Sequence, residues 1–205
     1  MFKNDPNNLK KMQITILANL DENLMIDLLA STNTYVHHVT ENAHDEADKI
    51  RIDTSLTIDE KDQLLEFLSD DINSAKEAMD LAQELAIIGL YKTIELRINK
   101  LVRASGLMSN NKISQLSAIG TLIYNFNNIG IDVTKIDHFN EFRELKLINN
   151  ALKHTGEINQ ELEDLNPTVW TKGQPLNNFT AHFIRLLSPN IKFLNNLGTK
   201  LRSKL

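Results

Sequence analysis

One segment of this chain combines three side chains that suit phosphate chemistry. In the helical pattern from Phe142 to Gly156, Arg143, Asn150 and His154 follow one another at intervals of seven and four residues. Because each residue turns a helix by about 100°, this spacing places all three on one stripe. A guanidinium, a carboxamide and an imidazole can together hold and protonate a phosphate ester. The same segment offers a separate apolar face to a core, so folding alone does not require the stripe.

The elements that position this stripe are expected to be helices. Glycine and proline are scarce, and few segments alternate apolar and polar residues with the period of a strand. The sequence therefore predicts an all-α fold, an antiparallel helical bundle. We expect an N-terminal helical elaboration over residues 1–70 and a bundle over residues 71–205, packed as one globular unit. Predicted helices cover residues 8–20, 22 into the forties, 57–68, 71–104, 112–127, a motif helix that ends at Gly156, and a C-terminal region interrupted near Pro189.

Three helix boundaries have specific signals. Thr57 and Glu60 have the spacing of a capping box, in which each side chain satisfies the backbone of the other. Asp137 is expected to cap the motif helix, and Gly156 is expected to end it. Pro189 is expected to break or kink the last helix, because proline lacks the backbone N–H.

Composition limits the classes of chemistry. The chain has 205 residues with 41% hydrophobic and 24% charged residues, which is ordinary for a soluble globular protein. It has no cysteine, which excludes disulfides, thiolate nucleophiles and cysteine-ligated zinc. Its N-terminus lacks an apolar signal core, and no apolar run is long enough to cross a bilayer. We expect a cytoplasmic protein without a membrane partner.

The net charge of −5 is unevenly distributed. Between Glu41 and Glu84, acidic residues clearly outnumber basic ones. Residues 165–205 contain no acidic residue but six basic ones: Lys172, Arg185, Lys192, Lys200, Arg202 and Lys204. Such a region can attract a polyanion. It can equally dock against the acidic segment of its own chain or of a partner.

Asn150 stands four residues before His154 at the end of a core helix, and a preceding long helix has Tyr91 and Glu95 one turn apart. In these features the chain resembles the HEPN superfamily, a group of all-helical domains found in prokaryotic toxins, abortive-infection proteins and some eukaryotic ribonucleases. The resemblance covers roughly residues 71–154, and the C-terminal helix is a further candidate for it. In that pattern an arginine stands directly before the asparagine. Here that place is Asn149, and the nearest arginine is Arg143.

The resemblance implies a function in defence or in a toxin–antitoxin pair. Members of the family resemble metal-independent endoribonucleases, which dimerise so that the motif arginine and histidine of two protomers line one cleft. They cleave RNA by attack of the ribose 2′-hydroxyl. For this chain the resemblance therefore implies a homodimer, RNA as a substrate or ligand, an antitoxin or other protein partner, and no cofactor.

Chemistry suggests a role for each residue of the candidate site. His154 would act as general acid or base, because imidazole exchanges protons readily near neutral pH. Asn150 would orient His154 or donate to a phosphate oxygen, and Arg143 would stabilise negative charge in the transition state. Four further residues are candidates for substrate binding: Asn149, Lys153, Lys146 and Glu95. Glu95 lies on the apolar side of its helix and needs a partner, for which Arg143 or His154 is expected.

These residues also have structural explanations. A cationic His154 in the last turn would complement the helix dipole. Arg143 would form an exposed ion pair with Glu144 or Glu141. A non-catalytic dimeric interaction protein with a degenerate HEPN motif is therefore the alternative function.

A metal-binding bundle protein is a more distant third hypothesis. His37, Glu41 and His44 share one helical face, and Glu41 and His44 have the spacing used in di-iron bundles. That chemistry needs a second glutamate–histidine pair, which the sequence does not supply. We therefore interpret this face as solvated and predict no metal site. The sequence also lacks a phosphate-binding glycine loop, a serine nucleophile elbow and a zinc-protease motif.

Overall fold

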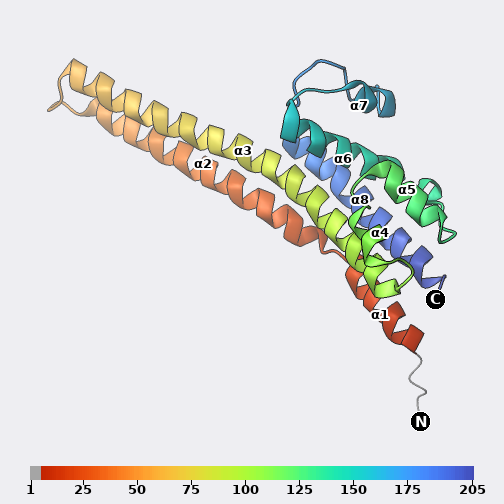
Figure 1. Cartoon of the computed structure of the whole chain (residues 1–205). Coiled ribbons are helices and arrows are strands. Elements are labelled where there is room, and N and C mark those ends of the chain that lie inside the picture. Colours follow the sequence, from red (N-terminus) through yellow and green to blue (C-terminus); the bar gives the residue numbers. More distant parts are fainter. Residues whose placement is uncertain (1–5) are drawn as a thin grey trace, which may run out of the picture. The chain divides into compact units, whose positions relative to one another are not determined.

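The computed structural model describes residues 6–205, apart from the side chains of Leu24, Leu28 and Thr32. Residues 1–5, which form part of the N-terminus expected to lack a signal core, lie outside the described residues. The described chain is all-α, as predicted, and has no strand (Figure 1). The helices are α1 (Pro6–Ala18), α2 (Glu22–Ile52), α3 (Ile58–Ser105), α4 (Asn110–Ser114), α5 (Ile119–Asn127), α6 (Phe139–His154), α7 (Gln160–Leu165) and α8 (Phe179–Arg202), with a short 3-10 helix, η1, at Val133–Lys135.

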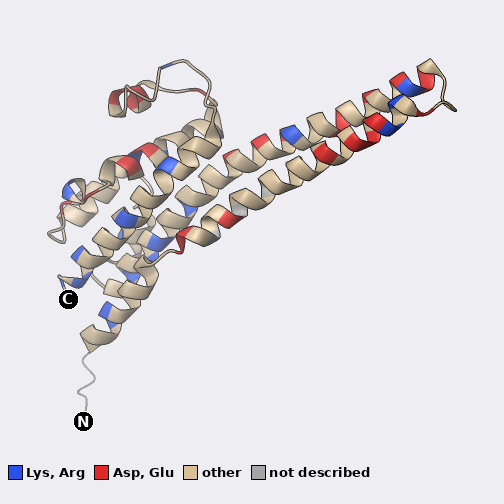
Figure 2. Cartoon of the chain, turned by 180° about the vertical axis from the view of Figure 1, so that it is seen from behind, with Lys and Arg blue, Asp and Glu red and all other residues tan. Residues whose placement is uncertain are grey.

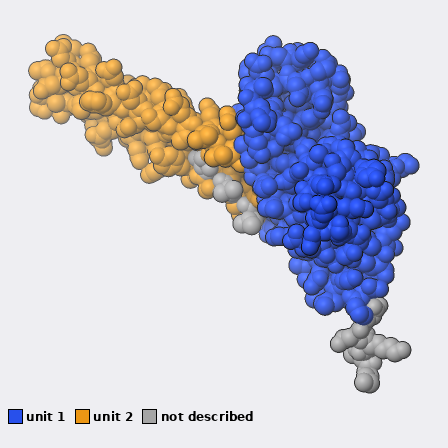
Figure 3. Space-filling view, in the orientation of Figure 1, with its two compact units in different colours: residues 1–22, 87–205 blue, residues 23–86 orange. Residues whose placement is uncertain are grey.

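The chain divides into two structural units, which are coloured separately in Figure 3. One unit, here called the hairpin unit, comprises residues 23–86; the other, the compact unit, comprises residues 1–22 and 87–205. These limits differ from the predicted division after residue 70, which falls inside α3. The structure has one helix, α3, where the sequence predicted two. Ser69 and Asp70 were expected to separate them, but neither residue is a glycine or proline, so nothing there interrupts the backbone hydrogen bonds.

In the hairpin unit, α2 and the first part of α3 run antiparallel (Figures 1 and 2). Small buried residues, including Ala43, Ala47 and Ala75, let the two helices pack closely. The predicted capping box is confirmed: the Glu60 backbone N–H donates to Thr57 Oγ1 at 3.3 Å, and the Thr57 backbone N–H donates to the Glu60 carboxylate at 2.8 Å. The turn between the two helices is therefore fixed by local side-chain hydrogen bonds.

In the compact unit, α8 packs against both α1 and α6. Four aromatic rings join three of its helices. The centroid of the Phe193 ring of α8 lies 4.8 Å from that of Phe142 and 6.0 Å from that of Phe139, both in α6. Phe142 in turn stacks on Tyr91 of α3, with ring centroids 6.4 Å apart. Aromatic stacking and burial at this junction hold α6 in a defined rotation about its axis.

Two predicted helices differ from the structure. The segment predicted as a single helix over residues 112–127 is divided into α4 and α5 by a turn, which leaves the Ser117 carbonyl free to accept from Lys146. The last helix is not interrupted at Pro189, because α8 runs from Phe179 to Arg202 with the proline inside it. Buried side chains on both sides of the proline, such as Leu186 and Phe193, hold it against the core.

The close packing of α1 on α8 depends on Gly198 of α8. A Cβ atom there would lie 2.8 Å from the Ala18 Cβ of α1, a distance that requires the helices to move apart. We expect Gly198→Ala to lower the free energy of unfolding by about 1–2 kcal/mol, because overpacking outweighs the better helix propensity of alanine. Gly89 of α3 is the matched control, since nothing lies within 4 Å of its added Cβ.

For Gly89→Ala the same propensity should raise the free energy of unfolding by about 0.5–1 kcal/mol. Both variants are measured by urea unfolding followed by fluorescence of Trp170, the single tryptophan. If the two substitutions changed the free energy of unfolding equally and in the same direction, the result would contradict the close approach of α1 and α8.

Candidate functional site

Helix α6 positions all but one of the predicted site residues. Its buried residues include Phe142, Leu145 and Ile148, which face the core as the apolar pattern predicted. The helix ends as predicted: Gly156 adopts a left-handed conformation with φ of 69°, and its N–H donates to the Ala151 carbonyl at 2.8 Å. Its start differs from the prediction, because His138 rather than Asp137 is the cap residue.

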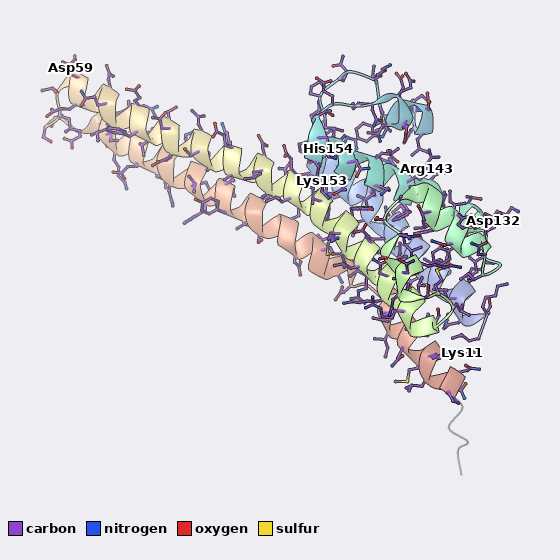
Figure 4. All side chains as sticks on the ribbon, in the orientation of Figure 1. Lys11, Asp59, Asp132, Arg143, Lys153 and His154 are labelled. Carbon is purple, nitrogen blue, oxygen red and sulfur yellow. The ribbon has the colours of Figure 1, made fainter. Side chains whose placement is uncertain are left out.

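Arg143 and His154 lie near opposite ends of α6 (Figure 4). They are eleven residues apart, so their backbones are separated by about 16 Å at 1.5 Å per residue. Neither side chain has a hydrogen bond or an ion pair with another described residue. Within one chain, these two groups therefore do not meet at one phosphate.

The ion pairs predicted for Arg143 are wrong. Glu141 pairs instead with His138, whose Nδ1 lies 3.0 Å from the carboxylate. Glu144 is buried and pairs with Arg185 of α8. Arg143 is half-buried, and its guanidinium forms no hydrogen bond or ion pair with another described residue.

Glu95 belongs to a polar network between α3 and α6. Lys92 Nζ lies 2.8 Å from the Glu95 carboxylate, and the Tyr91 hydroxyl donates to it at 3.3 Å. Lys146 Nζ in turn donates to the Tyr91 hydroxyl oxygen at 3.1 Å and to the carbonyl oxygen of Ser117. The prediction that Arg143 or His154 would be the partner of Glu95 is therefore wrong. Lys92 and Tyr91 satisfy the carboxylate instead.

Burial and charge shift two pKa values in this network. Burial, followed by the nearby Glu95 charge, raises the pKa of the Tyr91 hydroxyl, so it stays protonated and can donate. Burial lowers the pKa of Lys146; Glu95 opposes this shift and the charge of Lys153 adds to it. The network gives Lys146 and Glu95 a structural role in joining α6 to α3 and to the turn at Ser117.

The two asparagines differ in exposure. Asn149, which directly precedes Asn150, is only 1% exposed. Its Nδ2 donates weakly to Asn150 Oδ1 at 3.4 Å, and its own Oδ1 has no hydrogen-bond partner among the described residues. Asn150 is half-buried, whereas Lys153 and His154 are exposed. Of the residues predicted at this end of α6, Lys153 and His154 are therefore the two most open to a ligand.

Sequence reasoning missed a buried cluster on α6. The Glu144 carboxylate accepts two hydrogen bonds from the Arg185 guanidinium, at 2.7 and 3.0 Å, which makes a bidentate ion pair. It also accepts from Trp170 Nε1 at 2.5 Å. The His182 ring lies 4.3 Å from the Trp170 ring, and burial, with the Arg185 charge, lowers the pKa of His182. The lone tryptophan in a loop was the available signal, because a buried indole N–H needs an acceptor. The cluster attaches the loop after α7 to α6 and α8.

The histidine face of α2 is exposed to solvent. His37 Nε2 lies 3.3 Å from Glu41, and both side chains are exposed. His44 is also exposed. Within the described residues, no group of three or more histidine, aspartate or glutamate side chains could hold a metal ion. Nor does any helix among residues 6–205 combine the length and apolar character needed to cross a membrane.

Comparisons with protein-family models, with curated proteins and with solved structures find no match to this chain.

Proposed function

We propose that the compact unit is a HEPN-like RNA-binding unit that cleaves RNA without a metal ion, with His154 as its acid–base group. The observation that supports this most directly is the state of His154. It is the last residue of α6, its side chain is exposed, and it has no hydrogen-bond or ion-pair partner among the described residues. An imidazole in this position is free to exchange a proton with a bound substrate.

The proposed reaction is an intramolecular transesterification, in which the 2′-hydroxyl attacks the phosphorus bound to the 3′-oxygen of the same ribose. The 2′-oxygen attacks phosphorus as its proton is removed, the bond to the 5′-oxygen breaks, and that oxygen gains a proton. The products are a 2′,3′-cyclic phosphate and a 5′-hydroxyl. His154 transfers one of these protons, and a cation stabilises the charge on the phosphoryl oxygens.

A homodimer would supply that cation. Arg143 of the same chain is about 16 Å from His154 along α6, too far for both to hold one phosphate. Lys153 is adjacent and exposed, but lysine lacks the planar fork of arginine that matches a phosphate. We therefore propose that Arg143 of one protomer acts with His154 of its partner.

The test is RNA cleavage in EDTA by the wild type, His154→Ala and Arg143→Ala, with a matched His37→Ala control. His37 is also an exposed histidine, but it lies on α2. We expect His154→Ala to lower the cleavage rate by about 100-fold or more, with His37→Ala unchanged. Size-exclusion chromatography checks that each variant keeps its fold and oligomeric state.

Mixing the two inactive variants tests whether the site is shared. A mixed dimer of His154→Ala and Arg143→Ala contains one site with both groups, so partial recovery of cleavage is expected. Failure to recover, with each variant still dimeric, would contradict the shared site.

A non-catalytic interaction protein is the second candidate. The buried position of Asn149 favours it, because the place of the family arginine is closed to a ligand in this chain. No cleavage by the wild type above background, in several RNA pools, would favour this function over catalysis.

A further inference from the structure

Helix α1 has an apolar stripe that no described residue covers. Leu9, Met12 and Ile16 follow one another at helical spacing and are 61%, 61% and 59% exposed. The opposite face of α1, with Ile14 and Ala18, is buried, and α1 packs on α8. The exposed stripe therefore lies outside the buried face by which α1 packs on α8.

A groove lies beside this stripe, between α1 and the last turns of α3. It has a volume of about 460 Å³. Its lining residues are Gln13, Ile16 and Leu17 of α1 with Lys100, Arg103 and Ala104 of α3. Apolar side chains thus line its α1 side, and two exposed cations stand on its α3 side.

The charged residues that line the groove, Lys100 and Arg103, are both positive. Three segments contain no acidic residue at all: 6–20, 96–131 and 165–205. They come together in the compact unit, where α1 packs on α8 and the Arg97 guanidinium of α3 donates to the Leu17 carbonyl of α1 at 3.0 Å. In Figure 2, the lysine and arginine positions on the ribbons of these helices are blue. An anionic ligand would therefore meet no opposing carboxylate there.

We propose that this groove docks an acidic amphipathic helix of a partner protein. The apolar face of such a helix would cover Leu9, Met12 and Ile16, and its flanking carboxylates would meet Lys100 and Arg103. An RNA ligand fits less well, because nucleobases stack on aromatic rings and the groove lining has none. The proposal is independent of His154, which lies on α6.

The test uses a designed probe. A labelled helix of about 20 residues, with leucine on one face and glutamate flanking it, is titrated with the full chain and followed by fluorescence anisotropy. A second probe carries lysine in place of glutamate. The variants are Ile16→Ser, the Lys100→Glu/Arg103→Glu double substitution, and Ile184→Ser as the matched control. Ile184 of α8 is also 59% exposed in the same unit but lies outside the groove lining.

We expect the glutamate helix to bind the wild type and Ile184→Ser equally, and the other two variants about tenfold or more weakly. The lysine helix should not bind detectably. Two results would overturn the proposal. One is no binding of the glutamate helix to the wild type, and the other is a loss of affinity in Ile184→Ser equal to that in Ile16→Ser. Two others would identify a different occupant. RNA binding that the double substitution abolishes and Ile16→Ser spares would indicate a polyanion surface. Self-association that Ile16→Ser abolishes would indicate a second copy of the chain.

Discussion

Replacing Arg185 with methionine is expected to lower the free energy of unfolding of the compact unit by about 3–5 kcal/mol. Arg185 forms the bidentate ion pair with Glu144, whose side chain is only 4% exposed. Without the guanidinium, the buried carboxylate keeps two partners among the described residues, Trp170 Nε1 and a long contact to Asn166 at 3.5 Å. An unpaired buried charge is far more costly than the loss of the pair as a whole.

A double-mutant cycle separates these two contributions. Glu144→Gln alone and the double substitution Glu144→Gln/Arg185→Met are compared with Arg185→Met by urea unfolding. The double variant should be more stable than Arg185→Met, because it no longer buries an unpaired carboxylate. Lys192→Met is the control: Lys192 is an exposed base of the same helix, so its loss should change stability by no more than about 0.5 kcal/mol. Additive effects of the two substitutions would contradict the coupling.

Local sequence signals predicted most of α6 and the start of α3 well, because they act within a few residues. The apolar spacing, the glycine at position 156 and the capping pair of Thr57 and Glu60 each determine structure through backbone contacts nearby. The length of α3 was mispredicted for a related reason. Polar residues such as Ser69 and Asp70 look like a boundary, but they do not end a helix that packing supports on either side.

Partners distant in the sequence were not predictable from it. Glu144 and Arg185 are 41 positions apart, and the pattern around Glu144 suggested a local ion pair with Arg143. Lys146 reaches the Ser117 carbonyl only because the predicted helix over residues 112–127 is divided. The stripe of Arg143, Asn150 and His154 has the predicted angular position on α6, but its extent along the axis separates the groups. Whether they act together stays a prediction, which the mixed-dimer experiment tests.

The aromatic junction is the second feature with a large expected effect. Phe193 is fully buried and contacts both Phe139 and Phe142 of α6, and Phe142 continues the stack to Tyr91 of α3. Because Tyr91 also accepts from Lys146, this junction links the packing of three helices to the polar network.

Phe193→Ala is therefore expected to lower the free energy of unfolding by about 3–5 kcal/mol, from lost burial and the cavity left behind. Tyr124→Ala is the control, since Tyr124 is an aromatic residue of the same unit that is 65% exposed, and its loss should cost no more than about 0.5 kcal/mol. Urea unfolding monitored at Trp170 measures both. Hydrogen exchange then tests the link to the site: in Phe193→Ala the amides of α6 should exchange faster even without urea. Unchanged α6 exchange, together with the stability loss, would mean that other contacts hold the helix that carries Arg143 and His154.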